Sequence, residues 1–275
     1  MQWPVPQFPT RHVYNPRSGG GTGYVTITTG SPANTKGSYT TLASGTTYAG
    51  TWVYLNVSGT AVSGDDSSAV LDIAFGTAGN ETIVLADLLI GFRRKGGLLL
   101  PLYVPAGATV RGRAASARGS IGLAQSSLDV YGGEPDCGLT APGKITTYGV
   151  TAASSAGTTI TPNATTNTKG SYAQLAASTT APIHALLIAV QGSSGSLSSN
   201  VIYNIDIAVG GSGSETPIIR DHFVEVNSTE EMVPYAHEFV PLALNIPTGT
   251  RLSARCSGNA SSAAAIEVGV YGFTY

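Results

Sequence analysis

Apolar and polar residues alternate along most of the chain after residue 24, with the period of two that is typical of β-strands. The segment 201–209 is the clearest example, because Ile205, Ile207 and other large apolar residues fall on one face of it. Leu71 and Ile73 repeat the same face upstream. We expect these four isoleucine and leucine side chains to point into a core.

Strand-like segments separated by Gly, Ser, Asn and Pro clusters continue to the end of the chain. No amphipathic helix of useful length is apparent. About eight antiparallel strands in roughly 120 residues are typical of a jelly-roll or a related sandwich, so the sequence predicts an all-β protein. Besides 201–209, the second half is predicted to have strands over residues 146–151, 156–161, 172–177, 184–190, 239–244, 250–256 and 264–272.

One stretch occurs twice in the chain. Residues 34–39 and 167–172 both read Asn-Thr-Lys-Gly-Ser-Tyr, 133 positions apart. Other strings recur in the same order, and their separation grows to 140 near the two ends, as expected after a duplication followed by loop insertions. These strings are Val57-Ser58-Gly59 with Val190-Gln191-Gly192, Asp72-Ile73-Ala74 with Asp206-Ile207-Ala208, and Val130-Tyr131-Gly132 with Val270-Tyr271-Gly272. Both copies also enter a late strand through a Pro-x-Gly turn, at Pro105 and at Pro247.

The repeat predicts two tandem antiparallel β-sandwich, jelly-roll-like domains, each of ordinary domain size. We place the first over residues 24–133, a linker over 134–146 and the second over 147–275. Residues 1–23 are rich in Pro and end in a run of Gly, which favours an extended path. Aromatic side chains on such an arm cannot be buried against the arm itself, so we expect docking on a neighbouring subunit through Trp3, Phe8 and Tyr14.

Composition removes several classes of function. Charged residues make up 11% of the chain and the formal net charge is −2, which gives no electrostatic reason to bind nucleic acid. No apolar run approaches the roughly 18 residues of a membrane span. Cys137 and Cys256 do not occupy matching positions in the two copies, so we expect free thiols.

Signatures of catalysis are absent from the sequence: it has no Gly-x-Ser-x-Gly, Walker-type, His-Glu-x-x-His or Cys-x-x-Cys motif. His222 and His237 each adjoin an acidic residue on what reads as one enlarged loop, but their spacing matches no recognised metal site. Glu230 and Glu231 are adjacent and would point to opposite sides, unlike a glycosidase acid pair. We expect a non-enzymatic protein with no cofactor and no metal.

The repeated Asn-Thr-Lys-Gly-Ser-Tyr string, the segment 246–255 and the closing Val270-Tyr271-Gly272-Phe273 resemble β-rich structural proteins of tailed bacteriophages. The resemblance implies a virion component, either a capsid decoration protein or a part of the neck, tail or fibre. Such a protein would assemble in the bacterial host cytoplasm, with copies of itself and other virion proteins as partners. The resemblance carries over no functional residue.

The two copies differ most at one loop, which is basic in the first copy and acidic in the second. Opposite charges at equivalent loops predict a head-to-tail contact between the first domain of one subunit and the second domain of the next. The charges would set orientation, while nearby apolar residues would supply buried area. The residues concerned are Phe92, Arg93, Arg94 and Lys95 in the first copy and Glu225, Glu230, Glu231, Met232 and Tyr235 in the second.

A module that binds a cell-surface glycan, as in a phage tail fibre, is the alternative. Sandwich lectins bind sugars through aromatic side chains and polar loops. Tyr48, Tyr54, Tyr203 and Tyr235 are available for this role, although Tyr203 also belongs to the predicted core face.

Overall fold

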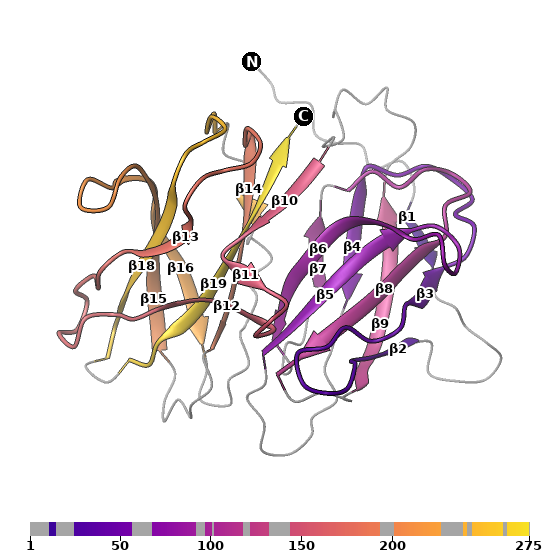
Figure 1. Ribbon diagram of the computed structural model, residues 1–275, viewed down its shortest axis with the longest axis horizontal. Coiled ribbons are helices and arrows are strands. Elements are labelled where there is room, and N and C mark those ends of the chain that lie inside the picture. Colours follow the sequence, from indigo (N-terminus) through magenta and orange to yellow (C-terminus); the bar gives the residue numbers. More distant parts are fainter. Residues whose placement is uncertain are drawn as a thin grey trace.

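The computed structural model is all-β, as predicted, and its described residues contain strands, turns and bends but no helix (Figure 1). No helix that could cross a membrane is therefore found in this part of the chain. The structure describes residues 11–14, 25–56, 68–91, 97–100, 102–117, 122–131, 144–192, 201–226, 239–240, 244–260 and 263–274.

The first half of the chain forms two antiparallel sheets. In sheet A, β9 lies between β1 and β4, β7 pairs with β4, and β2 also pairs with β9. Sheet B has the order β3-β8-β5-β6, so β6 is an edge strand. The bounds are β1 (Arg11–Tyr14), β2 (Val25–Thr28), β3 (Thr40–Ala43), β4 (Trp52–Asn56), β5 (Ser68–Phe75), β6 (Thr82–Gly91), β7 (Gly97–Leu100), β8 (Val110–Ser116) and β9 (Gly122–Tyr131).

The second half forms two more antiparallel sheets of the same design. In sheet C, β19 lies between β14 on one side and the short strands β10 and β12 on the other, with β17 beyond β14 and β11 beyond β12. Sheet D has the order β13-β18-β15-β16, with β16 at its edge. The bounds are β10 (Lys144–Tyr148), β11 (Val150–Thr151), β12 (Ala156–Ile160), β13 (Ala173–Ala176), β14 (Ala185–Gly192), β15 (Val201–Val209), β16 (Thr216–Val226), β17 (Phe239–Val240), β18 (Leu252–Gly258) and β19 (Ile266–Thr274).

Each half buries an apolar core between its two sheets, in a sandwich-like arrangement (Figure 1). The residues predicted to point inward are buried: Ile205 and Ile207 are in the second core, and Leu71 and Ile73 are in the first. Tyr203 is fully buried beside Ile205, as the alternation indicated.

The two halves use the same hairpin turn, as expected from the sequence. Thr46 donates its side-chain hydroxyl to the carbonyl of Pro105, and Thr179 does the same to Pro247. The backbone amide two residues after each proline, on Gly107 and Gly249, donates a hydrogen bond to the carbonyl of the same threonine. Both glycines have positive φ (76° and 86°), a conformation that L side chains rarely adopt.

Ladder pairing gives the register between the two halves near their ends. Leu55 pairs with Leu128 in sheet A, and Ile188, which is 133 positions after Leu55, pairs with Val270 in sheet C. Structurally equivalent residues in the last strands are therefore 142 apart, two more than the Val-Tyr-Gly strings suggest. A shift of two residues leaves every side chain on its own face of a strand, so the repeated string was misleading about register only.

The sequence placed β1 in an extended arm over residues 1–23. In the structure, Arg11–Tyr14 is a strand of sheet A in the same chain, with Tyr14 opposite Leu128 of β9. It takes the place that β10 takes beside β19. Trp3 and Phe8, the other residues expected to dock, lie outside the described residues.

The strand β16 was not predicted, because residues 216–226 were interpreted as part of an enlarged loop. The pairing of β16 with β15 skips residues between Ile219 and His222, where the strand has a bulge. A bulge moves all later residues to the opposite face, so a search for strict alternation fails here. Glu225, expected near a loop tip, is in this strand.

Candidate functional site

We call each half of the chain, with its two sheets, a domain. A buried carboxylate in the first domain is surrounded by cationic side chains and a backbone amide. Asp72, on β5, is 2% exposed. The ammonium group of Lys36 lies 2.7 Å from its Oδ1, and Nε of Arg113 lies 2.9 Å from its Oδ2. The amide of Asp87, on the edge strand β6, donates to Oδ1 at 2.9 Å. Three donors from three segments therefore meet at one carboxylate.

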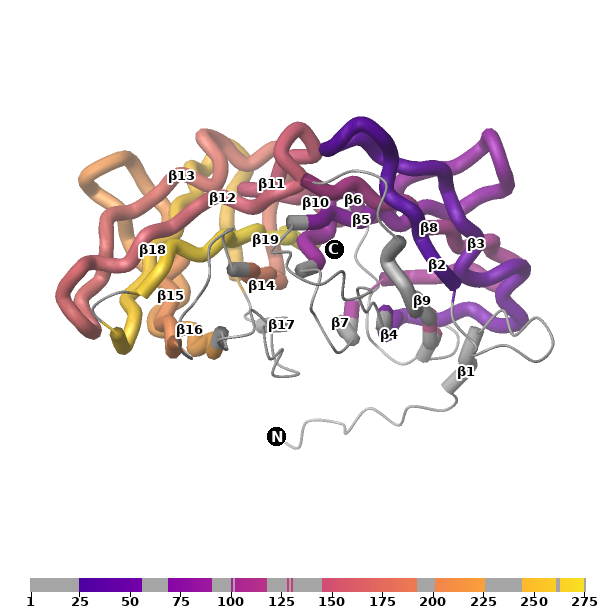
Figure 2. The backbone as a smooth tube through the Cα atoms, turned by 90° about the horizontal axis from the view of Figure 1, so that it is seen from below, coloured from indigo at the N-terminus to yellow at the C-terminus, as the bar shows by residue number. Residues whose placement is uncertain are grey.

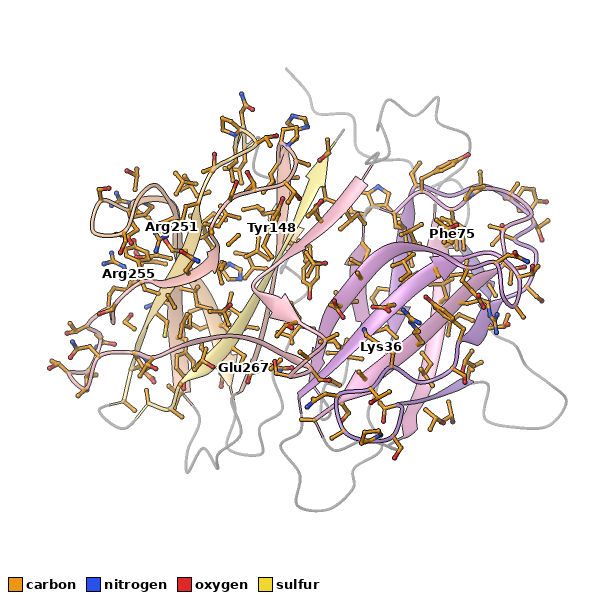
Figure 3. All side chains as sticks on the ribbon, viewed as in Figure 1. Lys36, Phe75, Tyr148, Arg251, Arg255 and Glu267 are labelled. Atoms are coloured by element: carbon orange, nitrogen blue, oxygen red, sulfur yellow. The ribbon has the colours of Figure 1, made fainter. Side chains whose placement is uncertain are left out.

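The second domain contains the same cluster, with distances that agree within 0.1 Å. Asp206, on β15, is 3% exposed and accepts from Lys169 at 2.7 Å, from Nε of Arg255 at 2.9 Å and from the amide of Asp221 at 3.0 Å. Figure 3 shows Lys36 on one domain and Arg255 on the other, far apart. We call the two groups the aspartate clusters: Lys36, Asp72, Asp87 and Arg113 in the first domain, and Lys169, Asp206, Asp221 and Arg255 in the second.

A tyrosine covers each arginine of these clusters. The guanidinium carbon of Arg113 lies 4.6 Å from the centre of the Tyr39 ring, and that of Arg255 lies 4.4 Å from the centre of the Tyr172 ring. Both contacts are within the range of a cation–π interaction. Burial raises the pKa of both tyrosines above its usual value, so their hydroxyls stay neutral.

These contacts explain why the six-residue string is repeated. Its asparagines, Asn34 and Asn167, have positive φ (62° and 58°). Their backbone amides donate hydrogen bonds to the backbone carbonyls of Ser116 and Gly258, at the ends of β8 and β18. Its glycines run so close to another backbone that an added Cβ would lie 2.0 Å from a carbonyl oxygen, which excludes any side chain. Its lysines bind the buried aspartates, and its tyrosines pack on the arginines.

The aspartate clusters also hold the bulges in the two edge strands. The register between β5 and β6 shifts between the pairs Leu71–Leu88 and Ile73–Leu85, and Asp87 in the bulge has φ of 53°. In the second domain Asp221 has φ of 52° at the matching bulge. Left-handed conformations are unfavourable for residues with a Cβ, so the bond from each bulged amide to the buried aspartate helps to keep them.

The clusters are structural rather than catalytic in character. Each holds two cationic and two anionic groups, so its formal charge is zero. Burial of the Asp72 carboxyl opposes ionisation, but its hydrogen bonds with Asp87, Lys36 and Arg113 outweigh burial and lower its pKa. The pKa of Asp206 is lowered for the same reasons. A carboxylate that remains ionised and already accepts three bonds is poorly suited to donate or remove a proton.

The bulge in β6 is where the two domains meet. The hydroxyl of Tyr271, on β19, accepts from the amide of Leu89 at 2.6 Å and donates to the carbonyl of Asp87 at 2.8 Å. The hydroxyl of Thr147, on β10, donates to the carbonyl of Ala86 at 2.5 Å. We call this contact between β6 and sheet C the seam.

Apolar packing continues across the seam, where β6, β10 and β11 lie side by side (Figure 2). Alternate residues of β14 face opposite ways: Leu186 and Ile188 belong to the core of the second domain, while Leu187 and Ala189 belong to the core cluster of the first. Tyr271 and Phe273 also join the first cluster. Sheet C is thus buried on both faces at β14 and β19, and the two domains share apolar contacts.

The residues predicted for the assembly interface are only partly covered by the structure. Tyr14 is in β1, a strand of sheet A in the same chain, and Glu225 is half-buried in the strand β16 rather than on a loop. The predicted contact between charged loops stays a prediction, because its other members lie outside the described residues. These are Trp3, Phe8, Phe92, Arg93, Arg94, Lys95, Glu230, Glu231, Met232 and Tyr235.

Other candidate groups have plain structural roles where the structure describes them. Burial raises the pKa of the Cys256 thiol to about 12, and this cysteine is free. Tyr203 is buried and donates its hydroxyl to the carbonyl of Ala264, so it cannot be part of a sugar platform. No group of three or more metal-binding side chains occurs among the described residues, and Asp221 there pairs with Lys169. His237, Tyr235 and Cys137 lie outside them.

Comparison with known proteins gives little further information. No protein-family model matches the chain, and no curated protein matches it either. The solved structure of tripeptidyl peptidase 2 is similar to it at 8% sequence identity and a TM-score of 0.25. The match covers 97% of this chain and 23% of that one, so the chain spans about a quarter of that protein. Similarity at this level indicates neither a shared fold nor a shared activity.

The lowered pKa of each buried aspartate predicts how stability depends on pH. A carboxyl whose pKa is lower in the folded state stabilises the fold above its unfolded pKa of about 4, and this contribution is lost as pH falls through the folded pKa. The parent should therefore lose unfolding free energy steadily below about pH 4. Asp72→Asn should be about 1–3 kcal/mol less stable at pH 7, because it removes the charged acceptor that Lys36 and Arg113 share, although Lys36 still pairs with Asp87. Its unfolding free energy should also depend less on pH in acid.

Urea unfolding between pH 2.5 and 7 measures both effects. Asp206→Asn is the matched variant in the second domain and should show the same loss of stability at pH 7 and the same weaker dependence on pH in acid. In the double variant, the two reductions in the slope of unfolding free energy against pH should add. If unfolding free energy falls equally steeply with decreasing pH in the parent and in Asp72→Asn, the buried Asp72 carboxylate is not a source of the acid sensitivity.

Removing one hydroxyl tests the seam. Tyr271→Phe leaves the ring in place but deprives the Leu89 amide and the Asp87 carbonyl of their partner, so it should cost about 1–3 kcal/mol of unfolding free energy. Tyr54→Phe, on a half-buried tyrosine outside the seam, is the control and should change stability by less than about 0.5 kcal/mol. Equal losses in the two variants in urea unfolding would mean that the Tyr271 hydroxyl does not stabilise the domain pair.

Proposed function

We propose that this protein is a non-enzymatic structural component of a bacteriophage virion, in the capsid decoration or in the neck or tail. The observation that carries the structural part is the seam: two sandwich-like domains are joined by hydrogen bonds and shared apolar packing into one two-domain unit. A unit that presents two similar domains is suited to repetitive assembly. The bacteriophage part of the proposal has its support in the sequence resemblance.

The distribution of charge also supports a structural role. The chain has few charged residues, and in the described part many of them pair with one another within one domain. The pairs Arg111–Glu81 and Arg251–Glu215 add to the aspartate clusters in the same way. Side chains that form these ion pairs within the fold are not available to bind a charged substrate.

A receptor-binding module that recognises a cell-surface glycan is the second candidate. The observation that favours it is Tyr48, whose side chain is 55% exposed on a loop of the first domain, as an aromatic sugar platform requires. Binding of the purified chain to a glycan array, lost in Tyr48→Ala, would favour this function over a purely structural one.

Location in the particle tests the primary proposal. Antibodies raised against the purified chain should label intact tailed particles at a constant position in negative-stain electron microscopy. The chain should also be present in gradient-purified particles in a fixed number of copies, measured by quantitative mass spectrometry against the major capsid protein. Its absence from purified particles that retain full infectivity would overturn the proposal.

A further inference from the structure

The seam uses one surface of each domain and leaves the equivalent surface of the other domain for a different partner. The first domain contributes its edge strand, β6, and the second contributes the outer face of sheet C. The second domain has an equivalent edge, β16, and the first has an equivalent face, the outer side of sheet A. Each chain therefore carries one further edge and one further face of the kind that form the seam.

The edge of the second domain keeps the local geometry of the seam. Asp221 and Asp87 have the same left-handed conformation at matching bulges, and both are bonded to a buried aspartate. Two residues beyond each bulged aspartate, Phe223 occupies the position of Leu89. Leu89 is 1% exposed because the second domain covers it, whereas Phe223 is 50% exposed. A large apolar side chain is thus presented at the point where the seam would form.

The outer face of sheet A has the complementary chemistry. By ladder register, Trp52 and Tyr54 of β4 occupy the positions of Ala185 and Leu187 of β14. The latter two are 4% and 1% exposed in the seam, while Trp52 and Tyr54 are only half-buried. Two aromatic side chains at the centre of an outer sheet face are typical of a protein interface.

The residue paired with Phe223 is more polar than the residue paired with Leu89. Asn204, which is half-buried, occupies the position of Val70. Val70 is fully buried within the chain. A surface that is exposed before two separately folded chains meet is expected to be more polar than one that is never exposed. The difference therefore fits a contact between chains.

We propose that β16 of one chain docks on the outer face of sheet A of a second copy, with Phe223 packed against Trp52 and Tyr54. The contact uses the same edge and the same sheet face as the seam. At the ladder positions of Tyr271 and Thr147, sheet A has Asp129 and Val13, so the contact relies on apolar packing and does not repeat the seam's hydrogen bonds. It rests on the assembly role proposed above. Each copy offers one edge and one face, so the contact is head-to-tail. Closed rings form if the rotation between copies closes, and filaments form if it does not.

Two variants each remove one side of the contact. Phe223→Asp breaks the edge and Tyr54→Asp breaks the face, and each should raise the dissociation constant for self-association at least about tenfold, which corresponds to about 1.4 kcal/mol. Tyr48→Asp changes an exposed aromatic residue elsewhere on the first domain and should associate like the parent. Mass is measured by sedimentation equilibrium of the full chain over a range of concentrations, and circular dichroism checks that each variant is folded.

Mixing the two variants tests the head-to-tail arrangement directly. The Phe223→Asp chain keeps an intact face and the Tyr54→Asp chain keeps an intact edge, so together they should form a complex of two chains and no larger. If either variant alone still forms dimers, the contact is between like surfaces and the proposal is wrong.

A parent chain that stays monomeric at all concentrations, or assembles equally well with Phe223→Asp, also overturns the proposed contact. Neither result touches the proposed function, which depends on the presence of the chain in purified particles. Conversely, if the chain forms the predicted contact but is absent from purified particles, the contact is supported and the virion role is wrong.

Discussion

A buried aspartate in each domain is the constraint on which the rest of the structure depends. Asp72 and Asp206 each bind a lysine from the repeated string, an arginine from the adjacent strand and the amide of a bulged residue at the sheet edge. An ionised carboxylate is costly to bury unless its partners surround it, so these positions tolerate little change. The cluster thereby fixes the string, the two central strands and the edge strand relative to one another.

The bulge held by Asp72 has a consequence beyond its own domain. It leaves the carbonyls of Ala86 and Asp87 and the amide of Leu89 available at the edge of β6, where Thr147 and Tyr271 bind them. An edge strand is normally a liability, because its free backbone groups invite pairing with other chains. Here that edge is covered by the face of sheet C, and this makes two small sandwich-like domains into one unit.

The alternation of apolar residues was sufficient to predict the all-β class, the inward faces of Leu71, Ile73, Ile205 and Ile207 and most strands of the second half. It failed at β16, where the bulge at Asp221 reverses the alternation. The ion pairs were also missed, although Lys36 and Asp72 both recur in a chain with only 11% charged residues. Sequence alone did not reveal that they meet, because the pairing depends on the sandwich. Origin by duplication remains a prediction, but the matching contacts of the two aspartate clusters are what it would produce.

Amide hydrogen exchange at Leu89 tests most directly whether the buried aspartate controls the seam. The account predicts that Asp72→Asn releases the bulge in β6 and speeds exchange of the Leu89 amide at least about tenfold relative to the parent. Asp206→Asn, the same substitution in the other domain, should leave exchange at Leu89 unchanged while speeding exchange at Asp221. Equal rates at Leu89 in the parent and in Asp72→Asn would contradict the claim that the cluster holds the edge strand in the conformation the second domain binds.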